Sequence, residues 1–377
     1  MQQISDKMAG LYVHIPFCKS RCIYCGFYST TSSGMAEKYV SALCREMDLR
    51  SGYCDQEWQT VYIGGGTPST LPHDQLRRLF SHIDCSHATE ITIECNPDDV
   101  THDFASLLAS LPVNRVSMGA QTFDDSRLRF LCRRHGAADV KRAVDNLRSV
   151  GIDNISVDLI YGFPDETIDQ WDADITTALS LDVEHLSAYC LSYEDGTPLH
   201  RLLAEGKVTE ADDELTRRMY YHLIDRLTAA GYEHYEISNF ARPGRRSRHN
   251  SSYWNSTPYM GIGAAAHSYD INSRQWNISD LLIYIKEVEQ GNLPFELETL
   301  DITERYNDTV MLSLRTLEGI DLPALRSTFG SGLHTYLLRQ AIQYEESGLL
   351  IHENDRLHLS REGLYVSDMV MSDLMKV

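Results

Sequence analysis

Short apolar runs alternate with amphipathic stretches at a regular spacing through the first half of this 377-residue chain. Six runs rich in β-branched residues are typical of strands, near residues 11–15, 59–63, 90–94, 114–118, 154–159 and 184–189. Between them, residues 36–49, 75–83, 103–108, 137–150 and 168–179 carry apolar side chains at the i, i+3, i+4 spacing of helices. This alternation predicts an α/β fold, a partial (β/α)6 TIM-like barrel, because six units fall short of the eight that close one.

Polar and reactive residue types stand close to the ends of these predicted strands. Cys18 follows the first, Gly64 to Pro68 follow the second, Glu94 closes the third, Gln121 follows the fourth and Asp158 nearly ends the fifth. In βα barrels the carboxyl ends of the strands meet on one face, and the chemistry takes place there. We therefore expect these residues to share one site.

Three cysteines follow the first predicted strand at the spacing C-x3-C-x2-C, at Cys18, Cys22 and Cys25. Structural zinc sites normally take four ligands in two C-x2-C pairs, and the sequence has no second pair of that kind. A [4Fe-4S] cluster fits better, because three soft thiolates hold three of its irons and leave the fourth open to an outside ligand. The spacing predicts such a cluster, with three unrelated cysteines as the alternative.

The other cysteines are expected to be buried thiols: Cys44, Cys54, Cys85, Cys95, Cys132 and Cys190. An odd total of nine argues against a disulfide framework and for a reducing compartment. The first ten residues lack the apolar run and cleavage pattern of a secretory signal, and the sequence has no apolar run of about 18 residues. We expect a cytoplasmic protein without an integral membrane span.

The net charge of −20 disfavours binding to the phosphates of nucleic acids. Residues 242–250, RPGRRSRHN, are a short basic stretch that we interpret as a solvated or ligand-facing loop. In YIGGGTPST, three glycines directly after a strand permit close approach of the backbone to a small polar ligand. No Gly-Lys-Ser/Thr follows, so this turn is not a P-loop.

The strand and helix rhythm weakens from about residue 205, where a long amphipathic helix ended by Gly231 is predicted. Residues 235–269 are rich in Tyr and Gly, which is more typical of a loop-like ligand surface than of a core. We expect a domain of residues 1–300 and a second of residues 301–377. The second is predicted to hold three helices and a short hairpin, a small winged-helix-like module whose acidic character argues against DNA binding.

The C-x3-C-x2-C spacing resembles the signature of the radical S-adenosylmethionine superfamily, and YVHIPFC resembles its branch of coproporphyrinogen III dehydrogenases and relatives. The resemblance implies a [4Fe-4S] cluster and S-adenosylmethionine as cofactors. It assigns the methionine amino group of the cofactor to the GGG element. The residues that it places at the cofactor are Tyr12, Tyr24, Gly65, Gly66, Thr67, Glu94, Gln121, Arg133 and Asp158.

Within that branch the chain resembles the HemW group of heme chaperones. Phe27 stands where the dehydrogenases carry a fourth cysteine, and only 17 residues precede Cys18. His249 opens HNSSYW, which is similar to the H-N-x-x-Y-W motif of the chaperones. The resemblance implies a chaperone that passes heme to acceptors such as respiratory hemoproteins, with membrane contact only through a partner and without coproporphyrinogen oxidase activity. The alternatives are a radical enzyme that oxidises coproporphyrinogen III, and a cluster-bearing structural protein.

Histidine chemistry suggests where heme would bind. A neutral imidazole is a good axial ligand for heme iron, and neighbouring aromatic rings suit a porphyrin face. We therefore expect His249 to be an axial ligand, the alternative being a histidine hydrogen-bonded within an aromatic loop. His267 is a second candidate, His14 is expected beside the cluster without binding it, and the arginines at 245, 246 and 248 are candidates to pair with heme propionates.

Overall fold

The computed structural model of the chain describes residues 9–51 and 57–377. The first eight residues, which bear on the expected absence of a leader, and Cys54 lie outside this part. Over the described ranges, no helix is both long and apolar enough to cross a membrane.

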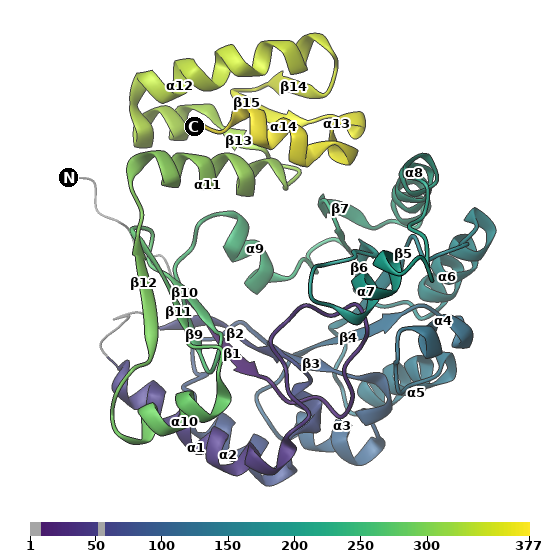
Figure 1. Cartoon of the computed structure of the whole chain (residues 1–377), viewed down its shortest axis with the longest axis vertical. Helices are drawn as coiled ribbons and strands as arrows, with labels where there is room; N and C mark the ends of the chain where they lie inside the picture. Colours follow the sequence, from purple (N-terminus) through teal and green to yellow (C-terminus); the bar gives the residue numbers. More distant parts are fainter. Residues whose placement is uncertain (1–8, 52–56) are drawn as a thin grey trace.

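One large sheet of twelve strands runs through the molecule in the order β12-β11-β10-β9-β1-β2-β3-β4-β5-β6-β8-β7 (Figure 1). Neighbours among the first six strands pair in parallel and follow the chain order. Their bounds are β1 (Ala9–Ile15), β2 (Trp58–Gly65), β3 (Glu90–Cys95), β4 (Arg115–Gln121), β5 (Ile155–Tyr161) and β6 (His185–Cys190). Within the described residues β12 and β7 are the two edge strands and do not pair with each other, so the barrel is partial, as predicted.

Amphipathic helices cover the outer face of these strands (Figure 1). They are α1 (Ala36–Leu49), α2 (His73–His82), α3 (His102–Ala109), α4 (Asp125–Phe130), α5 (Ala137–Ser149) and α6 (Ile168–Ser180). Leu11, Val13 and Ile15 of β1 belong to the core beneath them, each at most 1% exposed. Because side chains alternate along a strand, the intervening Tyr12 and His14 lie on the inner face. The predicted strands and helices of the first half are confirmed.

The aromatic stretch at residues 235–269, expected to be loop-like, instead extends the sheet at both edges. β7 (Glu233–Glu236) and β8 (Asn239–Ala241) lie beside β6, whereas β9 (Tyr259–Ile262) pairs in parallel with β1. Beyond β9 come β10 (His267–Tyr269), β11 (Ser273–Asn277) and β12 (Phe295–Thr299). Strands of three to five residues are too short for a clear periodic signal, and they form here by pairing with distant segments.

Four further helices belong to this half of the molecule: α7 (Pro198–Ala204), α8 (Asp213–Ala229), α9 (Arg248–Trp254) and α10 (Leu281–Glu289). The expected long helix is α8, which ends just before Gly231 in the left-handed conformation (φ +86°). α9 holds the HNSSYW sequence, contacts β2 and lies between the sheet and the C-terminal helices (Figure 1).

The C-terminal part has its own apolar core, built from residues between Tyr306 and Leu374. Its elements are α11 (Ile302–Leu314), β13 (Ile320–Asp321), α12 (Leu322–Glu346), β14 (Leu350–Glu353), β15 (Arg356–Leu359), α13 (Arg361–Tyr365) and α14 (Ser367–Leu374). α12 is two helical segments joined at Gly330, whose φ of +80° is not helical. The expected hairpin is β14 and β15, and β13 joins it as a third strand.

Polar contacts attach this part to the sheet. Arg315 at the end of α11 forms an ion pair with the buried Glu236 at 2.9 Å, and its guanidinium lies 5.0 Å from the centre of the Trp254 ring. Arg361 of α13 pairs with Asp225 of α8 at 2.6 Å. The HNSSYW helix is therefore in contact with both halves of the molecule.

The cysteines outside the triad do not all follow the expectation of buried thiols. Cys44 and Cys95 are buried, and Cys85 is partly buried. Cys132 and Cys190 are exposed, which corrects the prediction for these two residues. Cys132 sits in a turn just after α4 and Cys190 at the carboxyl end of β6, where the chain leaves the core for the open face of the sheet.

Candidate functional site

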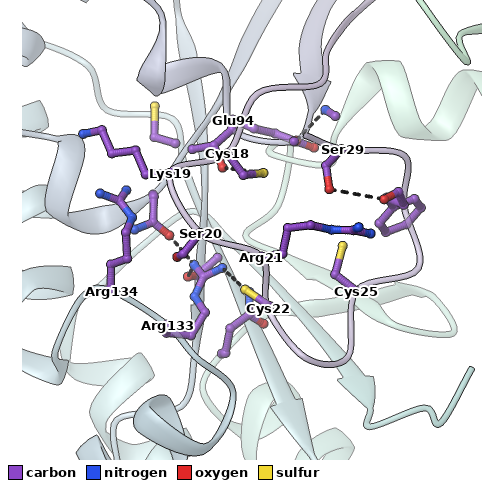
Figure 2. Close-up of a pocket in the computed structure, with 18 of the residues that line it drawn as sticks. Cys18, Lys19, Ser20, Arg21, Cys22, Cys25, Ser29, Glu94, Arg133 and Arg134 are labelled. Atoms are coloured by element: carbon purple, nitrogen blue, oxygen red, sulfur yellow. Dashed lines mark hydrogen bonds between the residues drawn. The ribbon is translucent and has the colours of Figure 1, made fainter. Parts of the chain in front are cut away.

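The loop after β1 brings Cys18, Cys22 and Cys25 to the wall of one pocket (Figure 2). All three thiols are free and partly buried. The Cys18 amide donates a hydrogen bond to the Thr30 carbonyl at 2.9 Å, which fixes the two ends of the loop together. The structure therefore gathers the predicted triad at the carboxyl edge of the sheet.

Polar donors stand next to two of these sulfurs. The Thr67 hydroxyl donates to Cys18 Sγ at 3.5 Å, and Arg133 Nη1 donates to Cys22 Sγ at 3.5 Å. Burial raises the pKa of the Cys18 and Cys25 thiols, so donors or a bound cation are needed to hold them as thiolates. In the described part of the chain no three candidate ligands converge on one metal ion. The three thiols line one pocket of about 190 Å³, a space that a multinuclear cluster can occupy.

The glycines after β2 lie against the cysteine loop. The Gly66 amide donates to the Ile15 carbonyl at 2.8 Å. A Cβ atom on Gly66 would stand 2.8 Å from the Pro16 carbonyl carbon and 3.0 Å from Cys18 Sγ. Gly65 has φ +113°, and a Cβ there would meet the His14 ring at 2.7 Å. Glycine is required at both positions because any side chain would push the turn away from the triad.

Glu94 is the residue before the last in β3 and lines the same pocket. Its Oε1 accepts a hydrogen bond from the Tyr62 hydroxyl at 2.7 Å, and its Oε2 accepts one from the Gly65 amide at 3.0 Å. Burial raises the pKa of the carboxyl group to about 7, against the lowering effect of the Tyr62 bond. A buried carboxyl group of this kind is prepared to bind a cation or hydroxyl groups.

Asp158, which belongs to β5, also lines the pocket. Burial raises its pKa to about 6, and the hydroxyls of Ser187 and Ser117 donate hydrogen bonds that oppose the rise. Behind it lies Arg115, which is 1% exposed and whose Nε and Nη1 find no acceptor among the described residues. The sequence offered no signal for Arg115, because a strand arginine is usually read as a solvated edge residue.

Gln121 and Arg133 both line the pocket, and their side chains lie against Gly119. Gln121 has φ +69° at an irregularity in the pairing of β4 with β5. A Cβ on Gly119 would lie 2.4 Å from Gln121 Nε2 and 3.2 Å from Arg133 Nη2. Arg133 Nη2 donates to Asn96 Oδ1 and to the Gly119 carbonyl, while its Nε has no partner in the described structure. That free donor suits a carboxylate in the pocket.

The two tyrosines assigned to the cofactor lie in different places. Tyr24 lines the pocket between Cys22 and Cys25, and burial raises its pKa. Tyr12 does not line the pocket: its ring stacks on Tyr62 at 6.1 Å, behind Glu94. The described contacts therefore give Tyr12 a supporting position beneath the pocket floor.

Sequence reasoning missed several lining residues that carry charge or polarity. Lys19, Arg21, Asn96, Ser117 and Arg134 all line the pocket. Figure 2 labels Lys19, Arg21 and Arg134. Four of these residues could have been found because they are neighbours in sequence of predicted site residues. Asn96 belongs to the ECNP sequence, Arg134 follows Arg133, and Lys19 and Arg21 lie between the cysteines. Lys19 and Arg134 are both paired with Asp99, at 2.6 Å and 3.0 Å.

His249 lies away from the cysteine pocket, buried at 0% exposure beneath the inner face of the sheet. Its Nδ1 bonds to the Thr60 hydroxyl and its Nε2 to the Tyr253 hydroxyl, each at 2.8 Å. Burial lowers its pKa to about 3, so the ring is neutral. Because both nitrogens are engaged and no ring edge is open, this conformation does not present His249 as an axial heme ligand. These contacts match the alternative, a histidine hydrogen-bonded within an aromatic cluster, and heme ligation by His249 stays a prediction.

The other heme-related candidates are dispersed. His14 Nδ1 lies 3.0 Å from the Tyr12 hydroxyl and its Nε2 lies 3.1 Å from the Tyr28 carbonyl, so it supports the cysteine loop. Arg246 is paired with Glu233 and Glu318, at 3.1 Å and 2.7 Å, on the surface between the sheet and the C-terminal part. His267 is exposed on β10.

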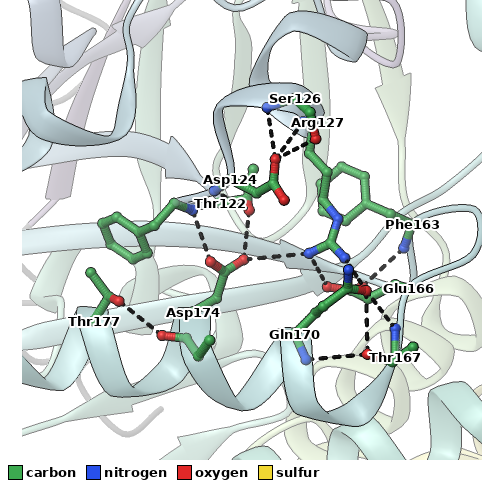
Figure 3. Close-up of polar contacts among 12 residues, drawn as sticks. Thr122, Asp124, Ser126, Arg127, Phe163, Glu166, Thr167, Gln170, Asp174 and Thr177 are labelled. Atoms are coloured by element: carbon green, nitrogen blue, oxygen red, sulfur yellow. Dashed lines mark hydrogen bonds and ion pairs between the residues drawn. The ribbon is translucent and has the colours of Figure 1, made fainter.

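A buried ion-pair network fixes the turns after β4 and β5 behind the pocket (Figure 3). Arg127 of α4 pairs with Glu166 at 2.8 Å, and Asp174 of α6 lies 3.9 Å from the same guanidinium. Glu166 also accepts hydrogen bonds from the Gly162 and Phe163 amides at 2.7 Å and 3.1 Å. Burial raises the pKa of Glu166 to about 7, which Arg127 opposes.

This network supports a small apolar cluster under the cysteine loop. Phe163 packs there with Leu131 and Leu199, and Ile23 and Tyr24 of the loop pack against them. The position of the triad therefore depends on packing from the end of α4, from β5 with the turn after it and from α7, as well as on β1.

Comparison with known proteins gives this fold and pocket a class. Residues 12–178 match the Radical SAM superfamily, and residues 300–366 match the HemN C-terminal domain. The fold is similar to that of coproporphyrinogen III oxidase (HemN) from Escherichia coli, described as a radical SAM enzyme, with a TM-score of 0.84. The alignment covers 98% of this chain and 91% of that one at 23% identity, which shows the fold alone. The protein is an α/β protein of the radical SAM class with a HemN-type C-terminal domain.

Relatives of known name narrow the class to one family. The heme chaperone HemW of Bacillus subtilis is 33% identical over 94% of this chain and 96% of its own length. HemW of Lactococcus lactis is 32% identical over 97% of both chains, and HemW of Escherichia coli is 35% identical over 68% of this chain and 69% of its own. The chain belongs to the heme chaperone HemW family.

Proposed function

We propose that this protein is a heme chaperone that holds a [4Fe-4S] cluster and S-adenosylmethionine in the cysteine pocket, binds heme and passes it to acceptor hemoproteins. The observation that carries the proposal is the pocket itself, which gathers three thiols, a glycine turn and two partly buried carboxyl groups in a chain of the HemW family. Radical SAM membership supports the two cofactors, and the names of the relatives support heme.

Cys18, Cys22 and Cys25 would hold the cluster. When bound, the cluster supplies an iron with an open position and an electron at low potential. The residues around it serve the thiolates: Thr67 and Arg133 donate to two sulfurs, and the close approach of Gly66 keeps the loop in place. Phe27 stands where the dehydrogenases carry a further cysteine, and it is 73% exposed at the pocket.

The other pocket residues would hold S-adenosylmethionine through complementary charges. The unpartnered Nε of Arg133 suits the methionine carboxylate, and the polar backbone of Gly65 and Gly66 suits its amino group. Glu94 and Asp158 are partly buried acceptors for hydroxyl groups and for positive charge. Each role is a binding role, and none requires proton transfer.

We also propose that the protein is cytoplasmic and that its partners are heme-acceptor proteins. It would contact a membrane only through such a partner. Two domains with a boundary at residues 300 and 301 fit the start of the C-terminal core at α11. The acidic net charge of −20 disfavours a nucleic-acid partner.

One set of measurements on the anaerobically reconstituted protein tests the function. We expect hemin titration to give a saturable change in the Soret band, and the loaded protein to pass hemin to apomyoglobin. We expect no conversion of coproporphyrinogen III to protoporphyrinogen IX with S-adenosylmethionine and a reductant. Failure to bind hemin would contradict the chaperone function. Conversion of the porphyrinogen would favour the oxidase instead.

A further inference from the structure

A second cavity, of about 500 Å³, lies at the opposite end of the sheet from the ion-pair network of Figure 3, where β10, β11 and β12 meet the loop that leads to β12. Its volume is within the range of ligand pockets. Aromatic and aliphatic side chains dominate the wall, and one imidazole joins them: His267, Trp276, Ile278, Leu293, Pro294 and Phe295.

The imidazole of His267 has no hydrogen-bond partner on either nitrogen among the described residues, in contrast to His249. Partial burial and the nearby Arg274 guanidinium lower the pKa of His267, so the ring is neutral near neutral pH. A neutral imidazole with a free nitrogen, in an apolar wall, is the usual form of a protein ligand to heme iron.

Strand register places an aromatic surface beside this imidazole. His267 pairs with Trp276 across β10 and β11, and the two ring centres lie 6.2 Å apart at 30°. Trp276 pairs in turn with Glu296 across β11 and β12, and its indole N–H donates to that carboxylate at 3.1 Å. This bond holds the indole in place beside the imidazole, so that both rings belong to the same wall of the cavity.

The HNSSYW helix is connected to this wall through tyrosines. Tyr253 bonds to His249 and lies edge-on to Tyr259 of β9 at 4.7 Å between ring centres. Tyr259 is followed by Tyr269 of β10 at 6.2 Å. The helix therefore orders the strands that carry His267, even though its own histidine is buried.

We propose that the β10–β12 cavity binds heme and that His267 is its axial ligand. The inference rests on the proposed heme-binding function and names the site for it. Iron porphyrin is the occupant that uses each feature of the wall: the free imidazole binds the iron, and the aliphatic side chains and the edge of the indole contact the macrocycle. Glu296 repels carboxylates from one side, so the propionates extend toward solvent.

Hemin titration of the full-length, cluster-reconstituted protein tests the site. His267→Ala should weaken hemin binding by about tenfold or more and remove the Soret band of the histidine-ligated form. Added imidazole should restore that band, because it can enter the space left by the side chain. The matched control is His352→Ala, which removes a partly exposed histidine from β14 in the C-terminal part and should bind hemin as the wild type does.

The outcomes separate this inference from the proposed function. Wild-type protein that does not bind hemin overturns both. Wild-type binding with an unaltered spectrum and affinity in the folded His267→Ala variant overturns the site alone. If that variant does not fold, Leu293→Asp takes its place: a carboxylate in the cavity wall should weaken hemin binding while the cluster spectrum is retained, and unchanged binding overturns the site.

Discussion

The hydroxyl of Tyr62 donates a 2.7 Å hydrogen bond to the carboxyl group of Glu94 on the neighbouring strand. The aromatic ring of the same tyrosine stacks on the imidazole of His249, with ring centres 5.0 Å apart. The HNSSYW helix and the cysteine pocket are therefore joined through one phenol, because Tyr62 is the residue that touches both.

Tyr62→Phe tests this connection. It removes one of the two donors to Glu94 and should weaken S-adenosylmethionine binding, because a hydrogen bond to a charged group contributes about 1.5–3 kcal/mol. Isothermal titration with the reconstituted protein measures the change. Thr70→Val, at a nearby residue whose hydroxyl bonds only to backbone carbonyls, is the control and should bind the cofactor normally. Unchanged affinity in Tyr62→Phe would show that the phenol does not support the binding carboxylate.

The raised pKa of Glu94 gives a pH dependence of stability with a definite sign. The pKa rises from 4.5 to about 7 on folding. Between these values the folded state binds more protons than the unfolded state, so the contribution of Glu94 becomes less favourable as pH rises. Denaturant unfolding of the cluster-free protein should show a steeper loss of stability from about pH 5 to about pH 8 for wild type than for Glu94→Gln. Parallel curves for the two proteins would contradict the shifted pKa.

The cysteine triad makes a prediction about iron. Replacing Cys18, Cys22 or Cys25 with Ser should abolish the visible absorbance and the bound iron and sulfide after anaerobic reconstitution, because each thiolate is expected to hold one iron. Cys44→Ser and Cys190→Ser are the controls, one buried and one exposed. Full iron and sulfide content in any single triad variant would rule out that residue as a ligand.

The network of Figure 3 predicts an asymmetric double-mutant cycle. Glu166→Ala leaves the Arg127 guanidinium buried without its 2.8 Å partner and should cost about 3–5 kcal/mol of stability. Replacing both residues, as Arg127→Met with Glu166→Met, should cost less than the single change, because no buried charge is left unpaired. Denaturant unfolding measures each variant. A double variant less stable than Glu166→Ala would contradict the argument.

His249→Ala should lower the stability of the folded protein, whether or not heme is bound. The change removes two buried hydrogen bonds and leaves a cavity next to Tyr62, which together should cost about 2–4 kcal/mol. Thermal unfolding measures the loss, and His249→Gln should recover part of it by keeping one acceptor or donor in place. A variant as stable as wild type would show that the ring is not part of the packed interior.

Much of the fold could be predicted because its signals are local. The six strands from β1 to β6 and the helices between them follow from apolar periodicity over windows of a few residues. The cysteine spacing and the glycines after β2 mark the pocket for the same reason, since neighbouring parallel strands bring consecutive strand ends together.

Only the tertiary structure decided how His249 and His267 are placed, one buried and the other accessible. Both lie in one Tyr- and Gly-rich stretch, and the sequence favoured His249 because of its motif. Its burial comes from partners far along the chain: Thr60 bonds to the ring and Glu90 accepts from the His249 amide at 2.9 Å. His267 is open because β10 lies toward the edge of the sheet, two strands from β12. Periodicity reports which residues share a face of one segment, whereas burial is set by the distant segments that pack against that face.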